Sequence, residues 1–486
     1  MRPFLKHICY LAALCLSVLS CKPCRNPQQT GCLPEIFPDY AGVTIPANIA
    51  PLDFEVSGAE RLEMEISAPD GQSIKVRGPW ADIPLKKWHR LTAAAKGDSL
   101  KFAVCALFED GWKAYRPFGI YVSPDSIDYG LNYRLIAPGY ELYSHMGIYE
   151  RNLSNFEERP LIENTGFIGC VNCHSYCKGD PSFMSLHIRG DHGGTLIRSK
   201  GGELEACNTS TSETLGSCVY PYWHPGGRYI AYSTNTTRQA FHQSPDKLVE
   251  VFDLDSDLQV YDTHTNTLIT APSIKREGIL ETMPSFSPDG GRLYFTAAEH
   301  QPIPSGLTQV RYGLYYVDFH DGAIGSEIHE VVAPQEGSIA FPRPSYDGRF
   351  ILYTKAAYGN FHAWHSSSDL MLLNLETGES RPLDEANSPD AESYHSWSTG
   401  SRWIVFGSRR DDGLHTRLYI SHIDPDGRCG KPFMLPQKNP RKYYDCHLRS
   451  YNVPEFVLRP VEFDRVKAEK IINRPERKAF SFRWSD

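Results

Sequence analysis

The pentapeptide Cys170-Val171-Asn172-Cys173-His174 is the stretch of the chain whose residue types and spacing indicate a definite chemistry. Two thiols separated by two residues can each form a thioether bond to one vinyl group of a haem, and the adjacent imidazole can bind the iron. In an exported protein this pattern predicts a covalently attached c-type haem. Cys170 and Cys173 would hold the haem, and His174 would be the proximal iron ligand.

Two other interpretations of the pentapeptide stay open. An oxidising compartment disfavours free thiols, so Cys170 and Cys173 can instead form a structural disulfide or a thiol-redox pair. A closed zinc site needs four ligands, and Cys177 or His187 is then the candidate for the fourth.

If haem is bound, a methionine on the opposite face of the iron gives a higher reduction potential than a second histidine. Two of the candidates, Met283 and His395, can instead be residues that pack near a turn and bind no iron. The candidates for the opposite face are Met283, His395 and His187, followed by His224 and Met184.

The N-terminus predicts export and a lipid anchor. Two cations, Arg2 and Lys6, precede an apolar run over residues 8–19 that is too short to span a bilayer, so residues 1–20 are predicted to be a signal peptide. Residues 18–21, Val-Leu-Ser-Cys, resemble the lipobox of bacterial lipoproteins and predict lipidation of Cys21, with ordinary cleavage near Ser20 as the alternative. The lysine that follows favours the outer membrane, facing the periplasm, over retention at the inner membrane.

Charge and cysteine content fit an envelope protein. The 486 residues carry a formal net charge of -8, which disfavours nucleic acid and leaves a redox protein or another envelope protein as the expected partner. Of the 13 cysteines, those outside the leader, the lipid site and the haem motif form an even set that favours disulfides. The candidate pairs are Cys24 with Cys32, Cys207 with Cys218, Cys429 with Cys446, and Cys105 with Cys177.

The first part of the mature chain predicts a tether followed by a small β domain. Residues 21–40 are rich in proline and lack a periodic apolar pattern. From residue 52 onwards, apolar and polar residues alternate, as in 62–66 and 73–77, on either side of the turn Asp70-Gly71. Residues 41–140 are therefore predicted to form a β-sandwich.

A repeat dominates residues 141–463. Each copy has an aromatic strand, a Gly-rich turn, an arginine and an alternating strand, and the arginines lie 64, 57 and 53 residues apart, which suits one propeller blade per copy. An isolated outer-strand pattern at 147–162 predicts that it completes the last blade around an inner strand near 451–458. With an atypical first blade over about 181–217 the count is six, and five or seven stay open. The copies are PYWHPGGRYIAYS from Pro221, PSFSPDGGRLYFT from Pro284, PRPSYDGRFILYT from Pro342 and HSWSTGSRWIVFG from His395.

These repeats resemble the TolB-like, WD-type β-propeller family of bacterial envelope proteins over about residues 142–460. The stretch GCVNCHSYC, placed as an insertion before the first blade, resembles a group of Bacteroidetes-type lipoproteins that are loosely labelled cytochrome c biosynthesis proteins. The repeats depart from the family at His395, where proline is expected, and at Gly226, where aspartate is usual. The expected fold is all-β, an N-terminal β-sandwich and a six-bladed propeller, with a tail over 464–486 that begins in a short helix.

Two functions follow as hypotheses. The first is an envelope lipoprotein that carries one haem c and passes single electrons to a partner. The alternative is a non-redox propeller that binds a protein or a glycan, with Cys170 and Cys173 as structural residues. Hydrolase and phosphate-loop motifs are absent from the sequence, so catalysis is not expected. The acidic run 253–257 lacks the glycine and glutamate of a calcium loop and is predicted to be a solvated loop or strand edge.

Overall fold

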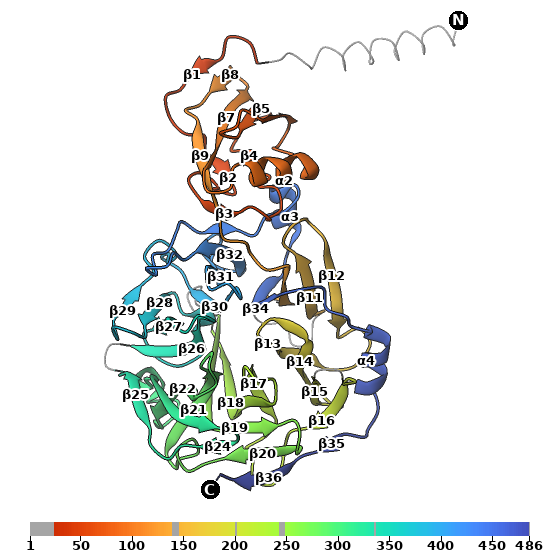
Figure 1. Cartoon of the computed structure of the whole chain (residues 1–486), viewed down its shortest axis with the longest axis vertical. Coiled ribbons are helices and arrows are strands. Elements are labelled where there is room, and N and C mark those ends of the chain that lie inside the picture. The colour runs from red at the N-terminus through yellow and green to blue at the C-terminus, as the bar shows by residue number, and fades with distance from the viewer. Residues whose placement is uncertain (1–23, 139–144, 200–201, 243–247, 335–336, 486) are drawn as a thin grey trace, which may run out of the picture. The chain divides into compact units, whose positions relative to one another are not determined.

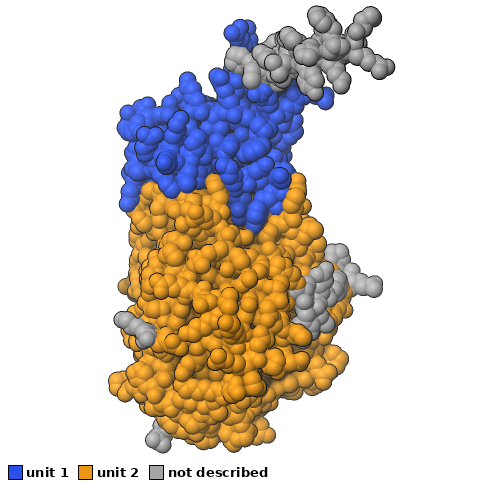
Figure 2. All heavy atoms as spheres, turned by 90° about the vertical axis from the view of Figure 1, so that its right-hand side faces the viewer, with its two compact units in different colours: residues 1–42, 51–122, 436–443 blue, residues 43–50, 123–435, 444–486 orange. Residues whose placement is uncertain are grey.

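The computed structural model describes residues 24–138, 145–199, 202–242, 248–334 and 337–485. The predicted signal peptide and the predicted lipidation site Cys21 lie outside these residues. The chain divides into two compact units, which Figure 2 colours separately: unit 1 contains residues 1–42, 51–122 and 436–443, and unit 2 contains 43–50, 123–435 and 444–486. Among the described helices, none is both long enough and apolar enough to cross a membrane.

Unit 1 is built on one twisted sheet with the order β1-β8-β7-β5-β6, and β9 also pairs with β7 (Figure 1). Strand β5 shows why these residues form a sheet: Leu62, Met64 and Ile66 are buried and alternate with polar residues. The bounds are β1 (Gln28–Gln29), β2 (Ile36–Phe37), β4 (Glu55–Val56), β5 (Arg61–Ser67), β6 (Ser73–Gly78), β7 (Ser99–Phe108), β8 (Gly111–Ala114) and β9 (Phe118–Ser123), with β2 and β4 paired as a separate sheet.

The helix α2 (Leu85–Ala94) is an element of unit 1 that the sequence analysis did not predict. It buries Trp88, Leu91 and Thr92, which lie three and four positions apart and therefore share one face of the helix. The spacing of these residues was the one sign of this helix in the sequence. It was missed because the segments on either side have the alternating pattern of strands.

Unit 2 contains a ring of six sheets, each of four or five strands, and is a six-bladed β-propeller (Figure 1). The sheet order confirms the predicted all-β class and the predicted number of blades. The strands, from the innermost outwards, are β13 (Cys170–Cys177), β14 (Asp180–Arg189), β15 (Gly194–Arg198) and β16 (Glu205–Asn208) in blade 1; β17 (Cys218–Trp223), β18 (Tyr229–Phe241), β19 (Val249–Asp262) and β20 (Thr267–Thr270) in blade 2; β21 (Ile279–Phe286), β22 (Arg292–Glu299), β23 (Gly313–His320), β24 (Ala323–Ile324) and β25 (His329–Val332) in blade 3; β26 (Ser338–Pro344), β27 (Phe350–Ala356), β28 (Asp369–Asn374) and β29 (Ser380–Pro382) in blade 4; and β30 (Glu392–Trp397), β31 (Trp403–Ser408), β32 (Arg417–His422) and β33 (Phe433–Met434) in blade 5.

Blade 6 closes the ring with strands from both ends of unit 2. Its innermost strand is β34 (Ser450–Val457), and its outer three are β10 (Gly130–Ile136), β11 (Gly147–Asn152) and β12 (Glu158–Glu163). β10 pairs with β34 from Gly130 opposite Val457 to Ile136 opposite Ser450. This confirms the predicted closure, and β34 covers the edge of β10 that would otherwise be free. The strand β10 was assigned to the β-sandwich by the sequence boundary at residue 140, but it belongs to this blade.

The first blade begins earlier than the sequence analysis placed it. The residues of the predicted insertion form β13, an inner strand paired with β14 from Cys170 opposite Arg189 to Cys177 opposite Asp180. The prediction failed because this copy has His174-Ser175-Tyr176 in place of Pro-x-Trp/Phe, and a Lys178-Gly179 turn with positive φ angles of 50° and 71° in place of Asp-Gly.

The C-terminal tail contains two strands that the sequence analysis did not predict. After the predicted helix, which is confirmed as α4 (Arg465–Ile472), β35 (Lys478–Ala479) adds to blade 1 and β36 (Ser481–Trp484) adds to blade 2. Both are parallel fifth strands on the outer edge of a blade. The remaining elements are β3 (Thr44–Pro46), α3 (Pro440–Cys446), η1 (Leu307–Gln309) and η2 (His362–Trp364).

Candidate functional site

All six inner strands share one irregularity. The pairing of each with its neighbour shifts register at or immediately before the proline position of the repeat, as between Val171 and His174 in β13. Such bulges re-aim side chains. The other shifts lie at Val219/Tyr222, Thr282/Ser285, Ala340/Arg343, Glu392/His395 and, on the partner of β34, Asn132/Arg134.

The bulged residues from different blades meet at the centre of the ring. Met283, Phe341 and Tyr394 are buried in one cluster, with Tyr220 and Val453 packed against it. Four of them have positive φ, between 46° at Val453 and 55° at Phe341, which a non-glycine residue adopts only where its surroundings hold it. The bulges therefore fill the centre of the ring with apolar side chains. Met283 Sδ accepts the backbone N–H of Phe341 at 3.3 Å, so this candidate for the opposite iron face is a packed core residue.

Cys173 occupies the same bulged position in blade 1. It is 8% exposed, while Cys170, at the start of β13, is half-buried. Burial raises the pKa of the Tyr394 phenol, the nearby charge of Arg134 lowers it, and the nearby Cys173 thiol raises it. The Cys173 thiol is therefore among the groups that face the central cluster.

His174 lies between blades. It is 2% exposed, and its Nε2 is 3.4 Å from the carbonyl oxygen of Asn132 in β10, the second strand of the preceding blade. His395 has the same arrangement, with Nε2 at 3.1 Å from the carbonyl oxygen of Leu352 in β27. Burial lowers the pKa of each imidazole to about 4. Both histidines are therefore neutral residues of a blade interface.

This geometry does not fit a haem iron bound to His174. The Nε2 atom faces the backbone of β10, and the other ring nitrogen, Nδ1, is buried without a hydrogen-bond partner among the described residues. A haem plane against either nitrogen would have to replace the packing between blades 6 and 1. Haem attachment at Cys170 and Cys173 stays a prediction of the sequence.

The other candidates for the opposite iron face lie in three places, because His187 and Met184 share the strand β14. His395 is at the interface of blades 4 and 5. His187 is 4% exposed in β14 with Nδ1 at 3.3 Å from Thr195 Oγ1, and burial lowers its pKa to about 3. His224 lies 3.3 Å from the carbonyl oxygen of Gly290, and Met184 is buried in the core of blade 1.

The described cysteines are all thiols in this structure, so the predicted disulfide pairings stay predictions. Cys207 and Cys218 are both fully buried and share one apolar cluster between blades 1 and 2, whereas Cys32 and Cys446 are exposed. Cys177 Sγ contacts the carbonyl oxygen of His224 at 3.4 Å.

A cavity opens where the six inner strands end. It has a volume of about 60 Å³, room for a few small groups, and every blade contributes to its lining. We call it the channel mouth. Its lining includes Ser175, Tyr222, Trp223, Phe286, Arg343, Tyr346, Ser396, Trp397, Glu455 and Phe456.

An arginine and a glutamate line the channel mouth, and no ion pair joins them among the described residues. Burial raises the pKa of the Glu455 carboxyl to about 8, although the nearby charge of Arg343 lowers it. Glu455 Oε2 accepts the backbone N–H of Tyr176 at 3.2 Å. Arg343 stacks over the Tyr222 ring at 5.2 Å, and the described residues form no ion pair with it. Within the same lining, Ser396 Oγ is buried and has no hydrogen-bond partner among the described residues.

Sequence reasoning missed both charged residues of the channel mouth. Arg343 and Glu455 follow the proline in their copies, at a position that Tyr222, Ser285 and Ser396 occupy in others. The available signal was a charged residue at a repeat position that is uncharged in the other copies. The sequence analysis did not align the segment around Pro454 with the other copies, so it did not place Glu455 at the same position as Arg343.

A long hairpin made by β18 and β19 packs on the central cluster. Its residues Leu248, Val249 and Val251 contact that cluster, and its carboxylates are held by the segment after β27. Glu250 accepts from Tyr358 OH at 2.8 Å and lies 2.8 Å from His365 Nε2.

The second carboxylate of the hairpin, Asp253, accepts amide N–H groups from Asn360 at 2.6 Å and Asn235 at 2.9 Å. Burial raises its pKa to about 6. Asp253 and Asp257 are each 6% exposed, so the prediction of a solvated acidic run was wrong for both, because the strand continues into the core.

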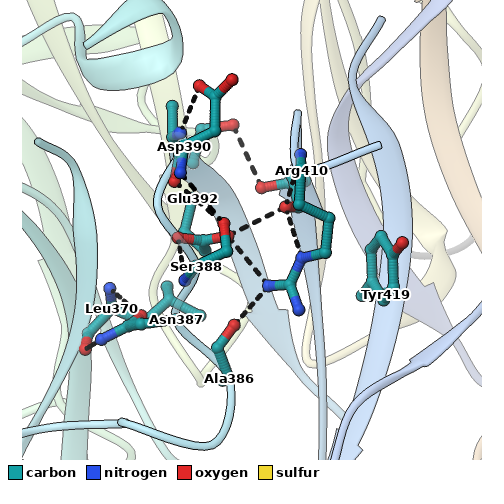
Figure 3. A network of polar contacts seen from close by, with 12 residues as sticks. Leu370, Ala386, Asn387, Ser388, Asp390, Glu392, Arg410 and Tyr419 are labelled. Carbon is teal, nitrogen blue, oxygen red and sulfur yellow. Dashed lines mark hydrogen bonds and ion pairs between the residues drawn. The ribbon is translucent and has the colours of Figure 1, made fainter. Parts of the chain in front are cut away.

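A third buried carboxylate, Glu392 at the start of β30, is fully partnered (Figure 3). Its Oε1 accepts from Ser388 Oγ, Ser408 Oγ and Arg410 Nη2, each at 2.8 Å, and its Oε2 accepts from the Ser388 backbone. Burial raises its pKa to about 7 against the opposing charge of Arg410. With its acceptor atoms in use, Glu392 holds the loop before β30 and leaves no group for a ligand.

No family model matches the chain, and no curated protein matches it. Solved structures that resemble it include an oligogalacturonate lyase in complex with manganese, with a TM-score of 0.37 and 13% identity over 63% of this chain and 74% of that one. A periplasmic gluconolactonase of Pseudomonas aeruginosa has a TM-score of 0.36 and 15% identity over 68% of this chain and 100% of that one. A prolyl endopeptidase has a TM-score of 0.35 and 10% identity over 63% and 42%. Likeness at this level assigns no function, and the propeller rests on its own sheet order.

Proposed function

We propose that the propeller is a binding module that holds the carboxylate end of a small hydroxylated ligand, such as a uronic acid at the end of a glycan, in the channel mouth. The observation that supports this proposal is that Arg343 and Glu455, on blades 4 and 6, line one cavity without forming an ion pair with each other. A group that bridges them would satisfy both.

The chemistry of the lining selects a carboxylate. The guanidinium of Arg343 presents a planar fork of donors that matches a carboxylate. With a pKa of about 8, Glu455 is largely protonated at neutral pH and can donate its proton to the second carboxylate oxygen. The unpaired hydroxyl of Ser396 is then available to a ligand hydroxyl. A cavity of about 60 Å³ admits such a group, while the rest of the ligand extends outwards.

The proposal keeps the cellular setting that the sequence predicts. The protein would be held in the cell envelope by lipid on Cys21, facing the periplasm, with Cys170 and Cys173 as residues of an inner strand. The electron-transfer hypothesis needs an accessible haem ligand, and the buried position of His174 favours the binding hypothesis instead.

The test compares sodium glucuronate with glucose, which differ only in the carboxylate. Trp223 and Trp397 line the channel mouth, so their fluorescence is a direct readout. We expect glucuronate to bind and glucose to bind far more weakly. Arg343→Gln is expected to weaken glucuronate binding roughly 10- to 100-fold through loss of charged hydrogen bonds. The exposed Arg349→Gln is the matched control and should bind normally. Equal binding of the two sugars, or an Arg343→Gln variant with unchanged affinity, would overturn the proposal.

A further inference from the structure

Cys24 and Cys105 lie beside each other in unit 1, although they are distant in sequence. Cys105 is in the central strand β7, opposite Ala114 of β8 and Glu63 of β5. Its thiol is in hydrogen-bond contact with the thiol of Cys24. Burial, and then this contact, raises the pKa of Cys105 to about 12.

The strand β1 fixes the segment that carries Cys24. Gln28 lies opposite Lys113 and Gln29 lies opposite Ala114, in a parallel pairing with β8. The backbone N–H of Thr30 donates to the carbonyl oxygen of Ala114 at 3.0 Å. The residue that contacts Cys105 therefore lies four positions before a strand of the same sheet.

Cys32 lies on the other side of β1. It is exposed, and its carbonyl oxygen accepts the N–H of Arg116 at 2.8 Å, beyond the end of β8. The sequence predicts a pairing of Cys24 with Cys32, whereas the structure places the Cys24 thiol beside Cys105. The pairing of Cys24 with Cys105 requires that these two neighbouring thiols be oxidised.

We propose that Cys24 and Cys105 form a disulfide bond in the mature protein. The partly exposed Cys24 attacks the disulfide of a thiol oxidase, releases one thiol of the oxidase and forms a mixed disulfide. Cys105 then attacks the Cys24 sulfur and releases the second oxidase thiol. The two cysteines lose two protons and two electrons in total, and the oxidase disulfide is reduced to a dithiol. The bond ties the tether to the central strand of unit 1, three residues after the predicted lipid site.

The test is peptide mapping of the full chain purified from its envelope without reductant and alkylated before digestion. Trypsin cuts after Arg25, Arg61, Lys101 and Lys113, so Cys24, Cys32 and Cys105 fall on three different peptides. We expect the peptide that ends at Arg25 to be joined to peptide 102–113, at a mass two hydrogens below the sum, and to separate on reduction. Linkage to peptide 26–61, or alkylation of both Cys24 and Cys105, would overturn the proposal.

Single variants provide the controls. Cys32→Ser should leave the linked pair intact, while Cys105→Ser should make Cys24 reactive to alkylation in the unreduced protein. If Cys105→Ser fails to fold, Cys24→Ser gives the converse reading, because Cys105 then becomes alkylated once the protein is denatured. Neither the Cys24→Ser nor the Cys105→Ser variant can form this disulfide. The mass assigned to the joined peptides must therefore be absent from both variants, and its presence would show that the peptides were wrongly assigned.

Discussion

His174 and His395 occupy equivalent positions in blades 1 and 5, and each places its Nε2 against a carbonyl oxygen of the second strand of the preceding blade, at 3.4 Å and 3.1 Å. The other four blades have proline there, at Pro221, Pro284, Pro342 and Pro454. His395 has this position although no haem motif surrounds it. Packing between blades is therefore enough to explain a histidine there, and no iron is needed. The motif histidine is thus a blade-interface residue.

We expect His174→Ala and His395→Ala to destabilise the protein by similar amounts, about 1–3 kcal/mol each, because each removes a buried side chain and one hydrogen bond. Urea unfolding measures both. His395→Ala is the matched control, since it lies outside the pentapeptide. A His174 effect confined to the spectrum of a bound cofactor, with unchanged stability, would contradict the interface role.

The same pair sets a pH dependence. Burial lowers the pKa of each imidazole from 6.5 to about 4. Between these two pH values the unfolded chain therefore binds more protons than the folded chain. The contribution of each histidine to stability is therefore full above pH 6.5 and falls as the pH drops towards 4, by up to about 3 kcal/mol per histidine. Unfolding curves between pH 7 and pH 4 test this, and the double variant should show a flatter profile than the parent.

We expect the protein from its native envelope to lack the mass of a covalently bound haem, because neither nitrogen of His174 is open to an iron. Intact mass and a haem-peroxidase stain of the denatured band measure this directly. A cytochrome c standard from the same preparation is the positive control. An added haem that survives denaturation would restore the electron-transfer hypothesis and require blades 1 and 6 to pack differently.

Ligand affinity should weaken at alkaline pH. Above a pKa of about 8 the Glu455 carboxyl loses its proton and places a negative charge beside the bound carboxylate. Glucuronate binding should therefore fall between pH 7 and pH 9. Glu455→Gln resembles the protonated side chain and should bind with little pH dependence over that range. A parent profile that is flat while the variant binds normally would exclude Glu455 from the ligand.

The hairpin of β18 and β19 should depend on His365. Replacing it with alanine removes a partner of the buried Glu250 carboxylate and is expected to cost about 3 kcal/mol in stability. Tyr358→Phe removes only a neutral hydroxyl donor to the same carboxylate and should cost about 1 kcal/mol. Hydrogen exchange in β19 should rise most in His365→Ala. Equal exchange in the two variants would show that the His365 contact does not hold the hairpin.

Much of this fold was predictable because the repeat encodes it locally. The Gly-rich turns in the copy from Pro284 and in the other copies predict the hairpins. The outer-strand pattern at 147–162, which has no inner hairpin before it, predicts the ring closure. The two strands of the tail were not predictable, because β35 and β36 are short and mostly exposed. Each pairs with the outer strand of a blade that is remote along the chain. The channel mouth was equally hidden, because Arg343 and Glu455 converge through the ring and are remote along the chain.

Ring closure by β34 also sets an order of events during synthesis. The strands β10, β11 and β12 leave the ribosome before the other strands of the propeller, while their inner partner β34 is almost the last part of the propeller to appear. Until residue 457 has been made, blade 6 lacks its innermost strand and the ring is open. A chain that is exported as it is made would therefore cross the membrane with an unfinished blade and complete its fold only after its C-terminal end has arrived.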